Sequence, residues 1–484
     1  MTAGAPPPRP SPAPGGGPRT ALVAGGGLAG VTAALRLAEA GFRVTLAEAR
    51  PRLGGLVFSF RRDSPAGELV VDNGQHVHLR CCTAYQWLLE RLGGTALSPL
   101  QRRLDVPVLD AARGRLGRLR RTALPVPLHL AASLATYPHL SPAERVAAAR
   151  AALALRSLDP ADPALDGVDF ATWLRRHGQS ERAVEALWDL VGVATLNARA
   201  ADASLGLAAM VFRTGLLSEP GAADIGVSRV PLGELHDRLT RTALDRAGVR
   251  TLLRARVRAV APDPDGGWRV TSGEGDGPGT EHRAGTVVLA VPPPQAHRLL
   301  PDGALPAPGR LRELGTAPIL NLHVVYDRRV LHRPFLAALG SPVQWIFDRT
   351  GAAGPAGGGQ YLALSQSAAH HEIDEPVAAL RKRYLPELER LLPAARGAAV
   401  RDFFVTRERH ATFAPVPGVG RLRPVARTLL PGVLLAGAWT DTGWPATMEG
   451  AVRSGLAAAR EALEDAGCPY RDDSPHSTER RAAA

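Results

Sequence analysis

The chain has 484 residues, of which 45% are hydrophobic, and its formal net charge is +12. This length favours two intertwined domains, and no apolar run approaches the roughly 18 residues that a transmembrane helix needs. The basic residues are scattered without an aromatic-interleaved module, which argues against nucleic acid as a partner and leaves attraction to anionic lipid as an alternative. The three cysteines, Cys81, Cys82 and Cys468, are too few for a disulfide framework and fit a reducing cytoplasm.

Both ends of the chain are predicted to lack regular structure. Residues 1–19 are rich in Pro and Gly, and they lack the cationic start and apolar stretch of a secretory signal. The polar residues 467–484 are predicted to form a flexible tail. The folded part of the protein is therefore expected between these two segments.

The first predicted elements are a strand, a Gly-rich turn, a helix and a second strand, an arrangement typical of a dinucleotide-binding unit. The strand is expected at Thr20–Ala24, the helix from the turn through Ala40, and the second strand at Arg43–Ala47. This order of elements makes the glycine pattern in the turn a much stronger signal than the glycines alone.

Each glycine of the turn has a separate expected role. Gly25 permits the tight bend, Gly27 lets the backbone approach a pyrophosphate, and Gly30 lets the helix pack closely on the strand. Leu28 and Ala29 open the helix, whose N-terminus attracts phosphate groups. A Gly-rich turn without a ligand is the alternative.

Glu48 follows the second strand, 18 positions after Gly30. A carboxylate at this place is expected to accept hydrogen bonds from the hydroxyls of an adenosine ribose. It disfavours a 2′-phosphate, which argues against NADP.

The middle of the chain alternates helical and strand-forming segments. Leu128–Leu158 is predicted to form one or two amphipathic helices interrupted by Pro138 and Pro142. Helices are also predicted within Trp173–Phe212 and after a Pro-Leu-Gly turn in Val227–Asp237. Strands are predicted at Arg250–Val260, Trp268–Thr271, Thr286–Val291, Leu320–Tyr326 and Val343–Phe347, and a flexible loop at Gly351–Gly359.

The last predicted elements are a buried strand at Gly432–Ala438 and a helix at Ala446–Leu463. The segment that joins them is rich in Gly, Thr and Trp. Backbone amides at the start of such a helix can stabilise negative charge on a bound group.

Two sequence motifs resemble the flavin-containing amine oxidase and phytoene desaturase superfamily. One is Glu48-Ala49-Arg50-Pro51-Arg52-Leu53-Gly54-Gly55, and the other runs from Gly437 to Ala451 and ends in Ser454-Gly455. The resemblance implies an α/β fold, in which a Rossmann-like FAD-binding domain of the GR2 flavoprotein type is interleaved with an α+β substrate-binding domain. It also implies a bound FAD. The cofactor is expected to be noncovalent because the second motif contains no cysteine, and no metal site is expected.

The resemblance also implies which further residues bind FAD. Ala49, Arg50, Arg52, Gly54 and Gly55 are expected to wrap the pyrophosphate, although Arg52 as a surface charge is the alternative. The backbone of Val257 is expected to bond the adenine edge, with a core valine as the alternative. At the C-terminal motif the expected contacts come from Gly437, Ala438, Trp444, Thr447, Met448 and Ala451. Ala438 departs from the usual Asp or Glu, which weakens one expected contact unless Asp441 compensates.

The same resemblance divides the chain into segments. We expect FAD-binding parts at 20–112, 231–300 and 416–466. We expect a helical part facing substrate or membrane at 113–230, and a substrate-binding sheet with helices at 301–415.

A narrower resemblance rests on Asp72-Asn73-Gly74-Gln75-His76, on Thr442–Thr447 and on Val193-Ala194-Thr195-Leu196-Asn197. Together these are similar to the squalene-associated FAD-dependent desaturases, the hydroxysqualene dehydroxylase group of hopanoid biosynthesis. That resemblance implies that reduced flavin removes the allylic hydroxyl of a long-chain isoprenoid, hydroxysqualene, to give squalene.

Candidate catalytic residues follow from this reaction. His76 is the first candidate acid, since an unperturbed pKa near 6.5 suits proton donation at neutral pH. Asp441 is the second. Asn197 and Gln75 are candidates for positioning the hydroxyl, and the alternative for each is to satisfy buried backbone groups. Gly74, Gln75 and His76 are also expected to lie against the flavin, where His76 in the alternative only holds the loop.

Other functions stay open at this point. A carotenoid (phytoene-type) desaturase would use the same cofactor. An amine oxidase commonly has a lysine near the flavin N5, whereas the matching strand Ala317–Tyr326 offers Asn321. A catalytically silent flavoprotein that delivers lipid between enzymes is the alternative outside enzymes.

The expected location is the cytoplasm, with peripheral contact at the inner face of the membrane and with neighbouring enzymes of the squalene pathway. The helices between Pro127 and Arg156 are the candidate docking surface for lipid headgroups. Their amphipathic stripe could equally pack in the core.

Overall fold

The N-terminal strand and the C-terminal strand of the protein belong to one five-stranded parallel sheet. In the computed structural model, which describes residues 19–275 and 277–469, the strand order is β19-β13-β1-β2-β9. The strands are β1 (Thr20–Ala24), β2 (Arg43–Ala47), β9 (Arg250–Leu252), β13 (Thr286–Leu289) and β19 (Val433–Leu435). Every pair of neighbouring strands in this sheet is parallel, and three distant stretches of chain contribute the strands. The predicted Rossmann-like arrangement is therefore confirmed.

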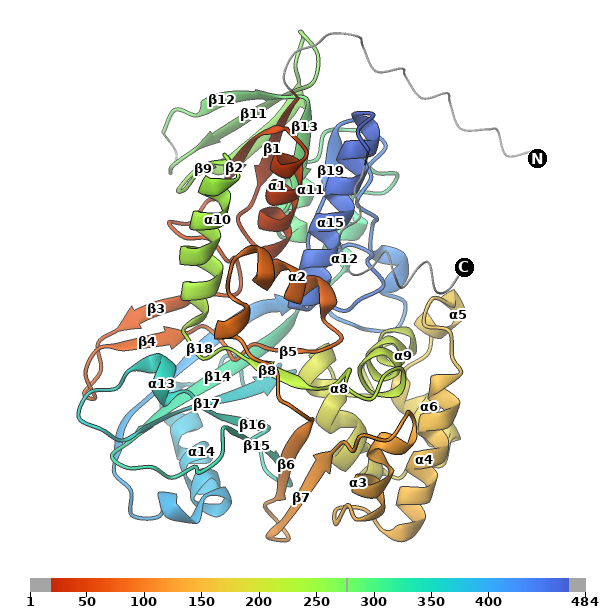
Figure 1. Ribbon diagram of the computed structural model, residues 1–484, viewed down its shortest axis with the longest axis vertical. Coiled ribbons are helices and arrows are strands. Elements are labelled where there is room, and N and C mark those ends of the chain that lie inside the picture. The colour runs from red at the N-terminus through yellow and green to blue at the C-terminus, as the bar shows by residue number, and fades with distance from the viewer. Residues whose placement is uncertain (1–18, 276, 470–484) are drawn as a thin grey trace.

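Helices α1 (Leu28–Glu39) and α15 (Met448–Asp465) lie side by side against this sheet (Figure 1). Two glycines allow the close packing. A Cβ atom at Gly30 would lie 2.0 Å from the Gly25 carbonyl oxygen, and one at Gly455 would lie 2.3 Å from the Ala29 carbonyl oxygen. The helix that follows β1 and the helix that follows β19 therefore meet beside the glycine-rich turn.

A seven-stranded mixed sheet forms the second large layer, in the order β18-β14-β17-β16-β15-β6-β7. Its long central strand β14 is buried along nearly its whole length between β17 and β18. The strands are β6 (Asp105–Asp110), β7 (Arg115–Arg120), β14 (Ala317–Tyr326), β15 (Phe335–Leu339), β16 (Trp345–Asp348), β17 (Gln360–Ser367) and β18 (Val400–Thr412).

Smaller sheets connect these layers. They are the three-stranded sheet β10 (Arg256–Pro262), β11 (Trp268–Gly273) and β12 (Thr280–Ala284), and the ribbons β3 (Ser59–Arg62) with β4 (Leu69–Asp72) and β5 (Val77–Leu79) with β8 (Ile225–Val227). The loop between β4 and β5 contains the motif Asp72–His76.

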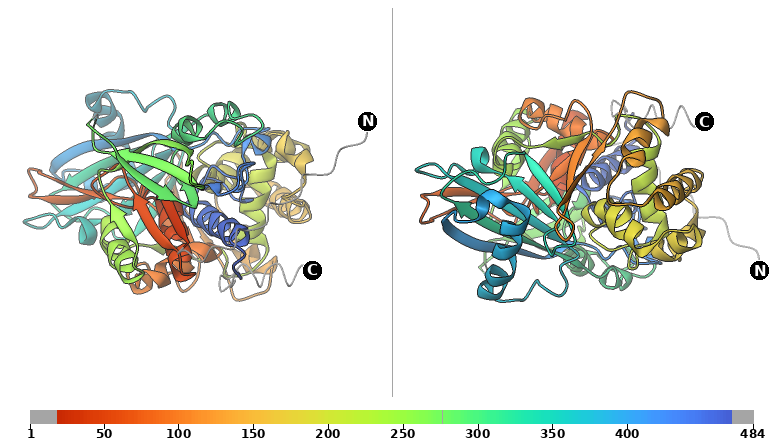
Figure 2. Two further views of the ribbon diagram at one scale, coloured as in Figure 1. Left: turned by 90° about the horizontal axis from the view of Figure 1, so that it is seen from above. Right: turned by 90° about the horizontal axis from the view of Figure 1, so that it is seen from below.

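The remaining helices cover these sheets. Figure 2 shows from above and from below that the helices of residues 131–217 lie on one side of the molecule and strands β14, β17 and β18 on the other. The β6–β7 edge of the seven-stranded sheet lies next to the helices. The helices are α2 (Thr83–Arg91), α3 (Ala131–Ala135), α4 (Pro142–Arg156), α5 (Pro163–Asp166), α6 (Phe170–Arg176), α7 (Glu181–Ala183), α8 (Asp189–Leu196), α9 (Leu205–Phe212), α10 (Thr240–Arg246), α11 (Pro293–Leu299), α12 (Arg310–Glu313), α13 (Thr350–Ala353) and α14 (Val377–Leu391). Wider π turns occur at Val184–Trp188, Arg213–Leu217 and Glu234–Leu239.

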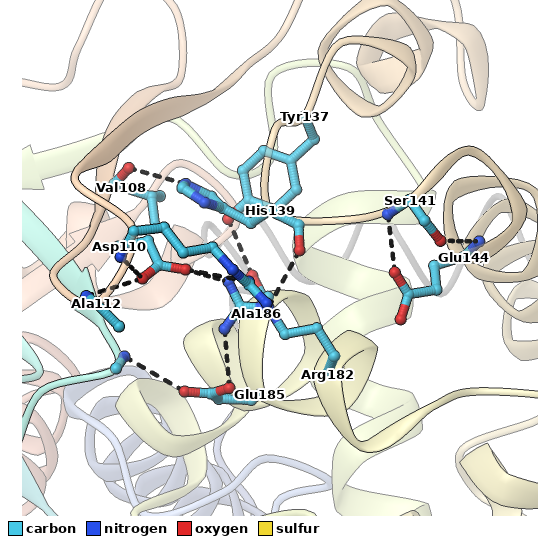
Figure 3. A network of polar contacts seen from close by, with 12 residues as sticks. Val108, Asp110, Ala112, Tyr137, His139, Ser141, Glu144, Arg182, Glu185 and Ala186 are labelled. Carbon is cyan, nitrogen blue, oxygen red and sulfur yellow. Dashed lines mark hydrogen bonds and ion pairs between the residues drawn. The ribbon is translucent and has the colours of Figure 1, made fainter.

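A polar network fastens the helical part to the edge of the seven-stranded sheet (Figure 3). Arg182 donates to the buried Asp110 carboxylate and, through Nε, to the His139 carbonyl oxygen. The His139 ring bonds the Val108 carbonyl oxygen at 3.0 Å. Since the Asp110 charge is removed from water, its pairing with Arg182 fixes how the helices sit on β6.

Several predicted elements differ in detail. The strand expected across Arg250–Val260 is interrupted, because Arg254 has φ +56° and turns the chain from β9 in one sheet into β10 in another. The Gly351–Gly359 loop begins within the short helix α13. Pro142 does not interrupt a helix: it follows the cap Ser141 and begins α4, where a missing N–H costs nothing.

Parts of the two predicted flexible ends, residues 1–18 and 470–484, lie outside the described residues. Among the helices of the described part, none combines the length and apolarity needed to cross a bilayer.

Candidate functional site

The turn between β1 and α1 leaves space for a ligand at one glycine only. Gly25 has φ +108°, and a Cβ there would lie 2.3 Å from the Ala290 carbonyl oxygen. Gly30 is equally restricted, because a Cβ there would lie 2.0 Å from the Gly25 carbonyl oxygen. At Gly27, by contrast, the nearest atom to a Cβ is the Gly55 Cα at 3.7 Å. Gly25 and Gly30 are therefore required by packing, whereas Gly27 borders open space.

In the described part of the chain, no side chain caps the N-terminus of α1. Its N-cap is Gly27, no side chain bonds the first-turn amides, and the first turn, which includes Leu28 and Ala29, contains no acid. A buried helix end with free N–H groups attracts anions. The donor set thus fits a pyrophosphate.

Glu48 is buried at the end of β2, and its carboxylate accepts from the Gly26 amide at 2.6 Å and from the Arg50 amide at 2.7 Å. Each carboxylate oxygen retains a lone pair for a ribose hydroxyl. The Glu48 carbonyl oxygen accepts from Ala255 N at 2.8 Å, which brings the segment before the half-buried Val257 to the same place. The adenosine contacts predicted for Glu48 and Val257 remain predictions.

The extension after Glu48 folds back onto the glycine-rich turn. Gly54 N donates to the Gly26 carbonyl oxygen at 2.9 Å, and Gly54 and Gly55 both have positive φ. Arg52 donates to the Gly55 carbonyl oxygen at 2.9 Å, and its guanidinium lies 3.4 Å from the centroid of the Phe58 ring. Arg52 is therefore a partly buried residue of this turn rather than a free surface charge, whereas Ala49 and Arg50 are exposed.

The C-terminal motif forms a second turn that ends at α15. Gly437 has φ +145°, and its amide donates to Ser454 Oγ at 2.8 Å, which ties the turn to the helix. Thr447 is the N-cap and accepts from Gly450 N at 3.1 Å. Trp444 lies beneath the guanidinium of Arg453. Ala438, Met448 and Ala451 are half-buried at this turn and helix start.

The loop between β4 and β5 is anchored through the buried Asp72. Its carboxylate accepts from Ser59 Oγ at 2.6 Å, from Leu232 N at 2.9 Å and from Arg349 Nη2 at 2.9 Å. Arg349 is itself buried and donates to the Ser228 carbonyl oxygen. These three partners come from three separate segments of the chain, so Asp72 is a structural centre of the site.

Asn73 continues this anchoring with both its side chain and its carbonyl. Its Nδ2 donates to the Leu56 carbonyl oxygen and to Glu408 Oε1. Its carbonyl oxygen accepts from Thr406 Oγ1 at 2.8 Å and from Asn321 Nδ2 at 3.1 Å. The loop is thus fixed to β14 and β18, which leaves Gly74, Gln75 and His76 as its free edge.

His76 differs from the expected acid. Burial lowers the pKa of His76 to about 4, although the nearby Asp72 charge opposes the shift. The ring is therefore neutral at pH 7, and the premise of an unperturbed pKa near 6.5 is wrong. Among the described residues the His76 ring has no hydrogen-bond partner, so it does not hold the loop through a ring hydrogen bond and is available to a ligand.

Asn197 has a structural position. It ends α8 with φ +59°, its Nδ2 donates to the Ala317 carbonyl oxygen and to Thr412 Oγ1, and its Oδ1 accepts from Ala368 N at 2.7 Å. The alternative that Asn197 satisfies buried backbone groups describes these contacts. The structure does not bring it into the loop at Gly74.

Asp441 is exposed, and it accepts from Gly443 N at 3.2 Å within the C-terminal turn. Gln75 is half-buried and has no hydrogen bond within the described residues. Neither the acid role of Asp441 nor the positioning role of Gln75 gains support from these contacts, and both stay predictions.

Sequence reasoning missed the residues whose partners are distant in the chain. The sequence pattern predicts no role for Arg349 or for Glu449, whose carboxylate accepts from the first-turn amides Ala84 N and Tyr85 N of α2. For Asn321 it shows only that this residue stands where amine oxidases commonly have a lysine. No local pattern identifies such residues, because their function depends on what the fold places beside them.

An apolar cavity of about 370 Å³ adjoins this region. It reaches Arg349, the partner of Asp72, and Val227, which pairs with Val77 directly after His76. Its lining includes the apolar residues Pro99, Leu100, Ile225, Val227, Phe335 and Phe347 and the polar residues Gln101, Ser228, Arg229 and Asp348. Among the described residues no cluster of His, Cys, Asp and Glu is suited to a metal ion.

Comparison with known proteins agrees with this arrangement. Residues 28–463 match the family described as flavin containing amine oxidoreductase. The chain is 30% identical to the hydroxysqualene dehydroxylase of Rhodopseudomonas palustris, over 91% of this chain and 97% of that one. It is 25% identical to the 15-cis-phytoene desaturase of Glycine max, over 93% of this chain and 80% of that one.

A solved oxidoreductase from Methanosarcina mazei has the same fold, with a TM-score of 0.70 and 15% identity over 91% of this chain and 100% of that chain. The family match begins at Leu28, inside the first glycine-rich turn, and spans the second turn, the Asp72–His76 loop and the strands that hold it. The resemblance stated from the sequence is confirmed: the chain belongs to the flavin-containing amine oxidoreductase family and is an FAD-dependent oxidoreductase.

Proposed function

We propose that this protein binds FAD noncovalently and converts hydroxysqualene to squalene by reductive removal of an allylic hydroxyl. The observation that carries the proposal is the 30% identity to a hydroxysqualene dehydroxylase across almost the full length of both chains. The segments 20–112, 231–300 and 416–466 are proposed to bind FAD. The helical segment 113–230 is proposed to face the substrate or the membrane, and the segment 301–415 to form the substrate-binding sheet with its helices.

FAD would be held by the two glycine-rich turns. The free amides of α1 and the open side of Gly27 suit the pyrophosphate, and Glu48 suits the ribose. The absence of cysteine from the motif at 437–455 supports a noncovalent cofactor. Reduced FAD supplies a hydride when bound.

The overall change replaces a C–OH bond with a C–H bond. The carbon gains a hydride, the C–O bond breaks, and the oxygen leaves as water after gaining one proton. A neutral His76 can donate its ring N–H as a hydrogen bond to the departing oxygen, while water or another group supplies the proton. The apolar cavity beside Arg349 suits part of the isoprenoid chain, because burial there removes apolar surface from water.

A carotenoid desaturase is the second candidate, since a phytoene desaturase shares 25% identity with this chain. Phytoene is a hydrocarbon without a hydroxyl. The unpartnered polar groups beside Gly74, described below, favour the alcohol. A silent lipid-delivery flavoprotein would bind either compound without changing it.

Anaerobic turnover tests the proposal directly. Protein with reduced FAD, mixed with hydroxysqualene, is expected to yield squalene and oxidised flavin in equal amounts, measured by product analysis and by the flavin absorbance. Phytoene added to the oxidised protein is expected to leave the flavin unchanged. Bleaching by phytoene without reaction of the alcohol would identify a carotenoid desaturase, and no reaction with either would identify a silent flavoprotein.

Substitutions at the first turn test how FAD is held. Gly27→Ala is expected to fold normally, because Gly27 has φ −75° and space for a methyl group, but to weaken FAD binding about tenfold or more. The measurement is titration of the apoprotein with FAD, followed by flavin fluorescence. Gly30→Ala is the matched control and is expected to destabilise the apoprotein, since its Cβ would overlap the Gly25 carbonyl oxygen. Unchanged FAD affinity in Gly27→Ala would contradict the assignment.

The proposed membrane contact lies on α4 and the segment before it. Val146 and Leu153 are two turns apart on the outer face of α4 and are each 52% exposed, with Arg150 exposed between them. Leu124 and Leu128 are also exposed nearby in the chain. Apolar side chains with interspersed arginine are typical of a helix that lies on anionic lipid.

Flotation with anionic liposomes checks this contact. Wild-type protein is expected to float at low salt, whereas a Val146→Glu, Leu153→Glu variant is expected to remain in the lower fraction because the two charges resist burial in the headgroup layer. Val377→Glu, at an exposed position on α14, is the matched control and should float like the wild type. Equal flotation of all three proteins would reject this surface.

A further inference from the structure

Asn321 has a buried polar atom that the protein itself does not satisfy. It lies in β14 between Ser365 of β17 and Thr406 of β18, with 0% of its surface exposed. Its Nδ2 donates to the Asn73 carbonyl oxygen at 3.1 Å. Because a carbonyl oxygen can only accept, the amide must turn its NH2 group toward Asn73, and Oδ1 faces elsewhere.

Oδ1 has no hydrogen-bond partner among the described residues. A buried acceptor without a partner costs about 1–3 kcal/mol, so native proteins retain few of them without a reason. A hydrophobic side chain would avoid this cost at the same position. The unpartnered oxygen therefore indicates that something outside the chain satisfies it.

The position of Asn321 identifies where that partner would lie. A Cβ atom at Gly74 would be 3.1 Å from Asn321 Nδ2, 3.6 Å from Asn321 Oδ1 and 3.6 Å from His76 Nε2. The amide of Asn321 and the ring of His76 thus approach the same point beside Gly74, where a side chain is missing. The His76 ring, as noted above, also lacks a partner.

We propose that Asn321 Oδ1 accepts a hydrogen bond from a ligand bound beside Gly74, and that His76 contacts the same ligand. The recognised chemistry is an N–H or O–H donor. Two sources fit: an N–H that flavin carries only when reduced, and the hydroxyl of the substrate alcohol, which rests on the proposed function. Asn321 is then a ligand-binding residue that favours the reduced cofactor or selects an alcohol over a hydrocarbon.

Three variants separate ligand binding from structure. Asn321→Leu removes Oδ1 together with the bond to Asn73. Thr406→Val is the matched control, because Thr406 Oγ1 donates to the same Asn73 carbonyl oxygen at 2.8 Å and its loss leaves Asn321 Oδ1 in place. Gly74→Ala removes no polar atom but places a methyl group beside the amide, 3.1 Å from Asn321 Nδ2. It tests the proposal if Asn321→Leu does not fold.

The first arm measures the midpoint potential of bound FAD without substrate. If the donor is the N–H of reduced flavin, Asn321→Leu and Gly74→Ala lower the potential relative to the wild type, whereas Thr406→Val leaves it unchanged. The bond exists only in the reduced state, so its loss destabilises that state alone.

The second arm measures the affinity of the oxidised, non-reacting holoenzyme for hydroxysqualene and for squalene through the change in flavin absorbance. If the donor is the hydroxyl, Asn321→Leu is expected to reduce the preference for the alcohol about five- to tenfold, the size of one hydrogen bond. Its affinity for squalene and both affinities of Thr406→Val should match the wild type.

A change in either arm supports the proposal and names the source of the donor. Folded Asn321→Leu or Gly74→Ala that behaves like Thr406→Val in both arms overturns it and leaves a buried water as the partner of Oδ1. Failure of the proposed function is distinguishable: the wild type would then neither convert the alcohol nor prefer it to squalene, while the potential would still report on Asn321.

Discussion

The pairing of Asp72 with Arg349 is the interaction on which the geometry of the site depends. Both side chains are buried, and the Asp72 carboxylate also receives hydrogen bonds from Ser59 and from the Leu232 amide. Removal of one partner from a buried ion pair typically costs about 3–5 kcal/mol, because the other charge stays behind. Loss of this pair would destabilise the loop after β4. That loop is bonded to the seven-stranded sheet, because Asn73 accepts hydrogen bonds from Asn321 of β14 and Thr406 of β18.

The first residues of this loop are anchored by hydrogen bonds, and the residues that follow them are left without such bonds in the part of the chain that the structure describes. Asp72 and Asn73 use their polar atoms for structure, whereas Gln75 and His76 have no hydrogen bonds within the described residues. A comparable division occurs at the first turn, where Gly25 and Gly30 are restricted by packing and Gly27 borders open space. In both places the fold satisfies the surrounding groups and leaves a short stretch of backbone and side chain for ligands, which is how a site is preorganised.

Local signals predicted the first unit with high accuracy. The strands at Thr20–Ala24 and Arg43–Ala47 have the predicted bounds, because apolar runs and glycines specify them without distant partners. Arg250–Val260 was harder, since the positive φ of Arg254 has no marker such as glycine. The glycine-rich turn at Gly25–Gly30 and the position of Glu48 after β2 could be predicted from spacing, and their roles toward FAD stay predictions.

Residues that act through distant partners could not be predicted. Arg349 meets Asp72 across 277 positions, and Asn321 meets Asn73 across 248. The neutral state of His76 is likewise a consequence of burial that composition does not show. Asn197 agrees with the alternative stated for it, because its side chain bonds backbone groups at the end of a helix.

We propose that cofactor and substrate meet at the Asp72–His76 loop. A crystal structure of the protein with FAD and an unreactive alcohol analogue of the substrate would test this proposal. FAD is expected to extend from the Gly25–Gly30 turn to the turn before α15, and the hydroxyl of the alcohol is expected to lie against the loop at Gly74–His76. An alcohol or a flavin ring bound away from this loop would contradict it.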